Sequence, residues 1–206
     1  MKTSKSEIMK NKILDTAEIL FVKKGYAHTT INDILEAGGI VKGSLYYYYK
    51  SKEEILDGVI KRHGDQAITA ATQVATDVKL NAKEKLLAIL LAQKPQDSHQ
   101  QQLIDDLEGS SDGYMFLKTV TDLLLRLAPI LGDIIINGNN EEVFNCPYPQ
   151  ESAEILLAAA HSLFDNANLH WSALELQARI PAFITATERL LGTKDGALIE
   201  MLQLFM

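Results

Sequence analysis

The run from Val41 to Lys50 contains the side chains of this sequence that are best suited to binding a polyanion. It reads Val-Lys-Gly-Ser-Leu-Tyr-Tyr-Tyr-Tyr-Lys. A lysine ammonium pairs with a phosphate, and a tyrosine can pack its ring on a sugar while its hydroxyl donates to a phosphate oxygen. Gly43 keeps the start of a helix small, so that backbone N–H groups can approach a phosphate. The pattern therefore favours contact with the backbone of a nucleic acid.

Four consecutive tyrosines can also be core aromatics, and helical geometry separates the two roles. Successive residues of a helix are turned by about 100°, so the four rings cannot all face inward and at least two must meet solvent. Leu45 and Tyr49 lie four residues apart and can anchor the helix with Ile34 and Ile40, while Tyr46 is intermediate. The residues left to face outward are Lys42, Ser44, Tyr47 and Tyr48.

Capping signals place this run in a three-helix arrangement. Ser4, Thr30 and Ser51 are each followed three residues later by an acidic residue, which is the capping-box pattern of a helix start. The Gly38-Gly39 pair must end the second helix, and only a short helix, residues 42–49, fits before the next start. Two short helices joined across the glycine pair, with a longer supporting helix before them, predict a helix-turn-helix.

Three motifs occur in order between residues 29 and 56. They are Thr-x-x-Asp-Ile from Thr30, Lys-Gly-Ser-Leu-Tyr from Lys42 and Lys-Ser-Lys-Glu-Glu from Lys50. This segment resembles the N-terminal DNA-binding domain of the TetR-type regulators, and the likeness covers about residues 8–62. The resemblance implies an all-helical homodimer whose N-terminal domain binds an operator and whose C-terminal domain senses a small molecule.

The resemblance also implies roles for single residues. Thr30 and Asn32 begin the first of the two short helices, against the DNA backbone. Lys42 and Ser44 face bases, and Lys52 and three of the tyrosines hold phosphates. Val41 stands where the family usually has a serine-like cap, so the reading helix lacks a side-chain cap worth about 1 kcal/mol and can offer a methyl group to thymine. The predicted DNA-binding residues are Thr30, Asn32, Val41, Lys42, Gly43, Ser44, Tyr46, Tyr47, Tyr48 and Lys52.

Charge is divided unevenly along the 206 residues. The whole chain carries −7, but residues 1–62 carry +3 and residues 63–206 carry −10. A basic block before an acidic block suits a phosphate-binding domain joined to a domain with another role, although solvated charged faces explain the charge alone equally well. Arg62 is the only arginine of the basic block, so guanine recognition would fall to Lys42.

The remaining composition excludes several classes. The single cysteine, Cys146, can close no intrachain disulfide and has no zinc-finger spacing around it. The apolar runs are far shorter than the ~20 residues of a membrane span, and no leader segment is evident, so we expect a cytoplasmic protein with no membrane partner. His161 and Asp165 lie at i and i+4 beside Ser162, but no H-E-x-x-H pattern or phosphate loop accompanies them. We therefore expect no enzyme, cofactor or metal site.

Helix signals continue to the end of the chain, and strand signals are almost absent. The sequence predicts an all-α fold of about nine to ten helices, with a three-helix DNA-binding domain at residues 1–50, the start of a long helix from residue 52, and a regulatory and dimerisation domain at residues 51–206. The later helices are expected at 81–94, 97–109, 114–136 with a kink or split at Pro129, 149–165, 172–192 with a kink at Pro181, and 196–206, with a long loop at 137–149.

The C-terminal domain offers candidates for two further roles. Broad apolar faces on the helices 150–165 and 173–191 can pair with their symmetry mates, since a twofold dimer reads two half-sites, although such faces can also pack within one subunit. Predicted dimerisation residues are Leu156, Leu163, Phe183 and Leu190. Predicted ligand-binding residues are Tyr114, Phe116, Val120, Leu124, His161 and Phe164, each of which can instead be plain core.

Together these patterns predict a homodimeric repressor that binds double-stranded operator DNA and is released by a small-molecule effector. Two alternatives remain open. A DNA-binding regulator without a small-molecule ligand would fill its C-terminal domain with side chains, and an enzyme or interaction module would keep the helical scaffold without binding DNA.

Overall fold

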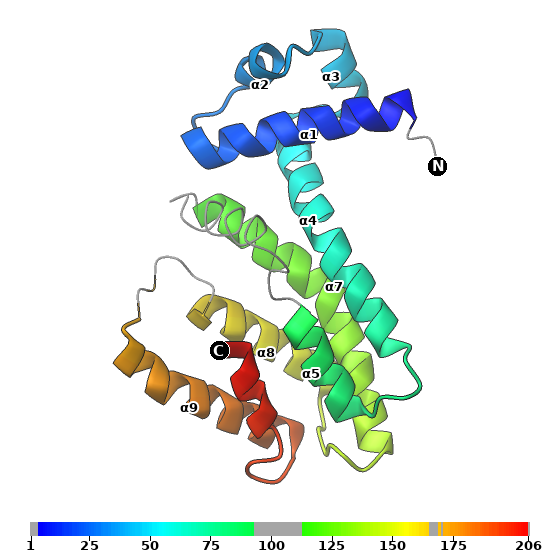
Figure 1. The fold of residues 1–206 in the computed structure, drawn as a ribbon, viewed down its shortest axis with the longest axis vertical. Helices are drawn as coiled ribbons and strands as arrows, with labels where there is room; N and C mark the ends of the chain where they lie inside the picture. The colour runs from blue at the N-terminus through cyan, green and yellow to red at the C-terminus, as the bar shows by residue number, and fades with distance from the viewer. Residues whose placement is uncertain (1–3, 93–112, 165–168, 170, 206) are drawn as a thin grey trace. The chain divides into compact units, whose positions relative to one another are not determined.

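The computed structural model describes the chain apart from residues 1–3, 93–112, 165–168, 170 and 206, and apart from the side chains of residues 66, 116 and 203–205. The described residues form α-helices and one 3-10 helix and contain no strand, so the predicted all-α class is confirmed (Figure 1). The helices are α1 (Lys5–Lys24), α2 (Ile31–Gly38), α3 (Lys42–Tyr48), α4 (Lys52–Ala75), α5 (Ala82–Ala92), α7 (Gly113–Asn140), α8 (Pro149–Phe164), α9 (Ala173–Leu191) and the 3-10 helix η1 (Ile199–Phe205).

The chain divides into two compact units. The first, here called the head, comprises residues 1–65 and 102–122, and the second comprises residues 66–101 and 123–206. Helices α4 and α7 each contribute residues to both units. The head therefore takes in a segment, the start of α7, that lies about 50 residues beyond the end of its continuous part.

The core of the head joins α1 to α4 and the start of α7 at their apolar faces. Helices α1 and α2 pack against each other. Each fully buried aliphatic or aromatic side chain contributes about 1.5–3 kcal/mol relative to exposure, so this small core accounts for much of the head's stability. Its buried side chains include Ile13, Ala17 and Phe21 of α1, Ile34 of α2, Leu45 of α3, and Ile55, Leu56 and Val59 of α4.

The predicted helix starts are confirmed at atomic detail. The Ser4 hydroxyl accepts the N–H of Glu7 at 3.1 Å. Full capping boxes, in which side chain and backbone bond reciprocally, stand at the starts of α2 and α9. Ser51 and Asn81 likewise accept the N–H of the acidic residue three positions later, at 3.1 and 2.9 Å. These bonds satisfy donors that the first turn of a helix leaves free.

The second unit has its own core, made by α5, α7, α8, α9 and the segment after α9. Gly192 ends α9 in the left-handed conformation, as its place after the last apolar residue predicts. Fully buried or nearly buried members of the core include Ile89, Leu127, Ile134, Ile135, Leu157, Leu191 and Leu198.

Helix α7 differs from its prediction. It runs without a break through Pro129, so the expected split there is wrong, and it continues to Asn140, four residues into the predicted loop. The Asn139 side chain accepts the N–H of Cys146 at 2.9 Å and donates to its carbonyl at 2.8 Å. These bonds fold the following loop back onto the helix end and override the local turn signal of Asn-Gly-Asn-Asn.

Two further predictions concern the helices expected at residues 196–206 and 97–109. The terminal helix is a 3-10 helix that begins at Ile199, three residues later than expected. The helix predicted at 97–109 lies outside the described residues.

Candidate nucleic-acid interface

The turn between α2 and α3 is built by glycine and by backbone hydrogen bonds. Gly39 has φ 55°, the left-handed region that glycine adopts without strain. Its N–H donates to Glu36 O, and the N–H of Ile40 donates to Leu35 O at 2.9 Å. Buried Ile40 then returns the chain to the core, and α3 starts two residues later.

Helix α3 has one face in the core and one in solvent. Leu45 is fully buried and Tyr49, directly after the helix, is 9% exposed, as the anchoring prediction requires. Val41 and Tyr47 are 74% and 75% exposed, although both are large apolar residues. Lys42 and Gly43 are also exposed. The solvent face of α3 therefore carries Val41, Lys42, Gly43 and Tyr47.

The remaining residues of α3 lie at the border of this face. Ser44, Tyr46 and Tyr48 are half-buried, and the two tyrosines pack partly on the head core. The rings of Tyr47 and Tyr48 meet edge to face with centroids 4.9 Å apart. Val41 makes no side-chain cap, as its residue type predicts. Of the α3 candidates, Val41, Lys42, Gly43 and Tyr47 thus face solvent, while Ser44, Tyr46 and Tyr48 are half-buried, although the sequence predicts that Ser44 and Tyr48 face outward.

The two candidates on α2 stand at its first turn. Asn32 and Thr30 are exposed, and the Thr30 hydroxyl accepts the N–H of Asp33 at 3.1 Å and donates to its carboxylate at 2.8 Å. The N–H of Thr30, the Lys24 ammonium at 2.9 Å and the hydroxyl of Thr30 lower the pKa of Asp33 to about 2. The carboxylate therefore stays ionised and holds the start of α2 firmly.

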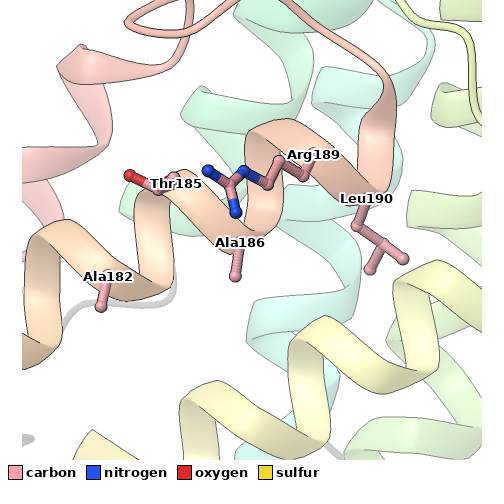
Figure 2. A pocket seen from close by; sticks show the side chains of 5 residues that line it. All are labelled: Ala182, Thr185, Ala186, Arg189 and Leu190. Carbon is pink, nitrogen blue, oxygen red and sulfur yellow. The ribbon is translucent and has the colours of Figure 1, made fainter.

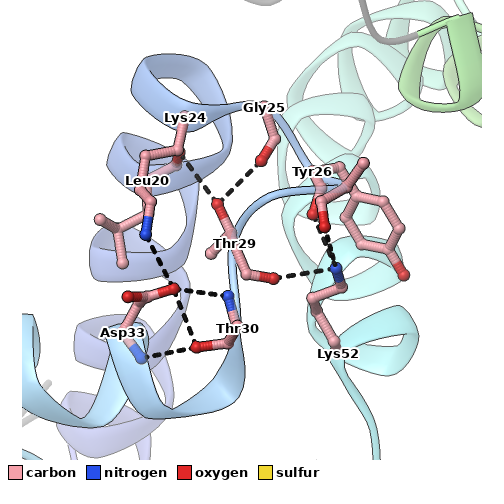
Figure 3. A network of polar contacts seen from close by, with 9 residues as sticks. Leu20, Lys24, Gly25, Tyr26, Thr29, Thr30, Asp33 and Lys52 are labelled. Atoms are coloured by element: carbon pink, nitrogen blue, oxygen red, sulfur yellow. Dashed lines mark hydrogen bonds and ion pairs between the residues drawn. The ribbon is translucent and has the colours of Figure 1, made fainter.

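Lys52 is the candidate whose surroundings differ most from the sequence expectation. Its ammonium donates to Tyr26 O at 2.7 Å and Thr29 O at 2.9 Å, and it lies 4.1 Å from the centroid of the Tyr26 ring (Figure 3). The Thr29 hydroxyl in turn donates to Gly25 O at 2.8 Å. Lys52 thus ties together the loop between α1 and α2, and a contact of its ammonium with phosphate stays a prediction.

Arg62 belongs to an ion cluster between α1 and α4. Its guanidinium pairs with Asp15 at 2.6 Å and with Glu18, which also meets His63 Nε2 at 2.7 Å. Burial alone would raise the pKa of Glu18, but the hydrogen bonds and charges of His63 and Arg62 bring that pKa below its usual value. The cluster ties α1 to α4 inside the head.

The start of α7 belongs to the head, which the sequence did not indicate. Met115 is 3% exposed and packs in the head core. Lys118 pairs with Glu53 at 2.9 Å and Asp57 at 2.7 Å, which raise its pKa well above the usual value. The Tyr114 hydroxyl donates to Glu53 at 2.7 Å, and this bond to a carboxylate raises the pKa of Tyr114. These partners are about 60 residues apart in sequence, so no local pattern could have found them.

The predicted ligand-binding residues divide between the two units. Tyr114 and Val120 belong to the head, whereas Leu124, His161 and Phe164 belong to the second unit. Leu124 packs against the second core, and Phe164 meets Phe183 edge to face at 5.5 Å. The side chain of Phe116 lies outside the described residues. Because these residues belong to different units, each described by itself, the prediction of a common ligand site stays untested.

The predicted dimerisation residues lie on α8 and α9. Leu156, Leu163, Phe183 and Leu190 are all half-buried, and the first and third pack partly on the second core. An open, shallow hollow lies along α9, and the described residues that line it all belong to that helix (Figure 2). Its lining residues are Ala182, Thr185, Ala186, Arg189 and Leu190. Their spacing of three and four residues places them on one face of the helix.

The described residues also bear on metal binding and on membrane insertion. No group of three or more metal-ligating side chains occurs in that part of the chain. None of its helices has both the length and the hydropathy of a membrane-crossing segment.

The two-helix unit with its glycine turn, exposed reading edge and supporting α1 defines a helix-turn-helix protein. Two family models match the chain. Residues 13–59 match "Bacterial regulatory proteins, tetR family", and residues 96–186 match "Tetracyclin repressor-like, C-terminal domain". The chain belongs to the TetR family of bacterial regulatory proteins.

Two curated relatives match short segments of the chain. The biofilm operon icaADBC negative transcriptional regulator IcaR of Staphylococcus epidermidis is 55% identical over 47 residues, which are 23% of this chain and 25% of the relative. The transcriptional repressor KstR2 of Rhodococcus jostii is 39% identical over 59 residues, 29% of each chain. The matched part thus spans well under half the length of these relatives.

Solved structures share the whole fold at low identity. GusR of Salmonella enterica superposes with a TM-score of 0.66 at 19% identity, over 93% of this chain and 100% of the other. SmeT, the repressor of the Stenotrophomonas maltophilia multidrug efflux pump SmeDEF, gives 0.66 at 20% identity, over 91% and 92%. At this level of identity the likeness concerns the fold.

Proposed function

We propose that this protein is a transcriptional repressor that binds double-stranded operator DNA through the exposed edge of α3. The observation that carries the proposal is the set of solvent-facing side chains on a helix whose opposite face is held by buried Leu45 and Tyr49. An α-helix fits the DNA major groove, where Lys42 can donate to guanine and Val41 can meet a thymine methyl. Repression follows the names of the relatives IcaR and KstR2.

Gly43 gives independent support for a partner at this edge. Among the described residues, apart from its chain neighbours and the nearby backbone of its own helix, no atom would lie within 4 Å of a Cβ built at Gly43. Alanine would favour the helix by about 1 kcal/mol, so nothing in the isolated protein explains a glycine here. Close approach of a DNA strand explains the missing side chain.

The first experiment is the selection of bound sequences from random double-stranded DNA, followed by affinity measurement on the selected site. Tyr47→Ala is expected to weaken binding, whereas Tyr148→Ala, which removes an equally accessible tyrosine from the second unit, leaves it unchanged. Affinity should also fall with salt by a slope of ~0.9 per phosphate contacted. Failure to enrich any sequence, or equal affinity of the Tyr47 variant and wild type, contradicts the proposal.

We also propose that the repressor is a homodimer joined through α8 and α9. The face of α9 formed by Ala182, Ala186 and Leu190 borders an open hollow, and small side chains there allow close approach of another helix. A twofold dimer presents two reading helices to two half-sites. Ala186→Glu is expected to yield monomers in sedimentation and a loss of operator affinity, because a charge would be buried at the contact. A variant that remains dimeric would place the interface elsewhere.

Release by a small-molecule effector completes the proposal. Support comes from the match of residues 96–186 to the C-terminal domain described as tetracyclin repressor-like. The candidate contacts remain Tyr114, Phe116, Val120, Leu124, His161 and Phe164. A screen for compounds that raise the unfolding temperature and release operator DNA tests this step, and a repressor insensitive to every class of compound would favour the ligand-free alternative.

A further inference from the structure

The first turns of α7 are part of the operator-reading head, although the family match assigns them to the C-terminal domain. The N-terminal family model ends at residue 59 and the C-terminal model begins at residue 96, so both Tyr114 and Met115 fall in the second match. In the structure Met115 is nearly fully buried in the core shared with α1 to α4 of the head. The head is therefore built from two separate stretches of chain.

Tyr26 is the residue on which this second stretch acts. Its ring is stacked on that of Tyr114, with centroids 5.3 Å apart and planes at 28°. The Tyr26 ring also meets the Phe21 ring edge to face at 5.3 Å and lies 4.1 Å from the Lys52 ammonium. Tyr26 lies in the loop between α1 and α2, so these contacts decide where that loop runs.

The loop leads directly to the candidate DNA contacts of α2. Lys52 binds the carbonyls of Tyr26 and Thr29, and the next residue, Thr30, caps α2 (Figure 3). Thr30 and Asn32 are the two exposed residues of this turn that the sequence assigns to the DNA backbone. The same ammonium lies over the Tyr26 ring, so a displacement of that ring would disturb the group that holds Thr29.

Charges fix the start of α7 against the first turns of α4. Lys118 pairs with Glu53 and Asp57, and Tyr114 donates to the same Glu53. Because Tyr114 is thereby held at its hydroxyl end, its ring has one defined place to stack. The Lys118 ammonium also lies 5.6 Å from the centroid of the Tyr114 ring.

We infer that Tyr114 is a positioning residue for operator binding, which through the ring of Tyr26 sets the α1–α2 loop and the start of α2. The inference rests on the proposed function of the head as a DNA reader. It assigns Tyr114 a task in addition to the ligand contact that the sequence suggested. It also makes residues 113–118 a place from which operator affinity can be altered without touching DNA.

The test is a double-mutant cycle in the full chain with Tyr26→Leu and Tyr114→Leu, read on the selected operator. Loss of an aromatic pair is expected to reduce affinity by about three- to tenfold in each single variant. The double variant should lose little more than either single one, since both remove the same contact. Tyr114→Phe keeps the stacking and should retain most of the affinity, and Leu117→Ala, at an exposed position of the same helix, is the control.

A merely structural role is separated by amide hydrogen exchange in the free protein. Exchange should accelerate in residues 26–31 of Tyr114→Leu and stay at the wild-type rate in α3. Wild-type affinity in Tyr114→Leu, strictly additive losses, or a uniform acceleration over the head would each overturn the inference. If the wild-type chain binds no DNA, the proposed function fails, while exchange in residues 26–31 still decides whether Tyr114 holds the loop.

Discussion

Replacing Lys52 with methionine removes one ammonium that several backbone carbonyls of the α1–α2 loop share. The ammonium donates to Tyr26 O at 2.7 Å, to Thr29 O at 2.9 Å and, at 3.5 Å, to Ala27 O. It also lies over the Tyr26 ring. Methionine keeps the aliphatic stem of the half-buried side chain, so the change removes the charge and the donors but little packing.

The expected loss follows from these contacts. A hydrogen bond that involves a charged group contributes about 1.5–3 kcal/mol, and a cation over an aromatic ring contributes about 0.5–1 kcal/mol at an accessible site. Water can replace part of this at the half-exposed loop, so we expect a net loss of about 2 kcal/mol. In a chain of this size 1 kcal/mol shifts Tm by roughly 2–4 °C, which gives a decrease of about 4–8 °C.

Thermal unfolding and operator affinity at several salt concentrations decide between two roles for Lys52. If it ties the loop, Tm falls while the slope of log affinity against log salt is unchanged. If it binds a phosphate, Tm is unchanged and the slope becomes shallower by ~0.9. Lys42→Met, which removes an exposed ammonium of α3 that is predicted to face bases, is the matched control and should lower operator affinity without a change in Tm. The second pattern in Lys52→Met would refute the assignment to the loop.

Three further predictions concern the head. Gly58→Ala is expected to lower the free energy of unfolding by about 1–2 kcal/mol in denaturant, because its Cβ would lie 2.9 Å from Leu14 and 3.2 Å from Tyr49. Alanine in place of glycine usually stabilises a helix, so a more stable variant would contradict this prediction. Gly43→Ala should leave stability equal or higher while lowering operator affinity, and unchanged affinity would remove the argument for DNA at that position. Glu18→Gln should cost about 2 kcal/mol at neutral pH, since it removes a buried carboxylate from its contacts with the partly exposed side chains of Arg62 and His63.

The Glu18 prediction also has a pH dependence with a defined sign. The pKa of Glu18 in the folded chain lies below its ordinary 4.5, so its contribution to stability is full above that pH and is lost as the pH falls through the folded value. Acid unfolding of the wild type should therefore be steeper than that of Glu18→Gln. Parallel acid curves for the two proteins would show that the carboxylate gives no net stability.

What the sequence predicted correctly depends on neighbours close in the chain. The caps at Ser4, Thr30 and Ser172 need only a residue three positions away, and all three form. The division of α3 into an anchoring and an exposed face follows from the 100° step of a helix, and burial of Leu45 and Tyr49 agrees with it. Such features depend on residues that lie within three to eight positions of one another.

What the sequence did not predict depends on partners far along the chain. Lys52 meets carbonyls 23–26 residues away, and Lys118 meets an aspartate 61 residues away. The residues next to Lys52 and Lys118 in the sequence indicate neither of these contacts. The same holds for α7, whose helical path through Pro129 to Asn140 is supported at its end by Asn139 and the loop folded onto it.

The precision of the reading helix must come from outside α3 itself. The helix has seven residues and no side-chain cap, and a helix so short is not stable alone in water. Its orientation is fixed by the Gly39 turn before it, by Leu45 in the core, and by Tyr49 packed where Gly58 of α4 leaves room. Operator affinity should therefore be as sensitive to Gly58→Ala, far from any predicted DNA contact, as to a substitution on the exposed edge.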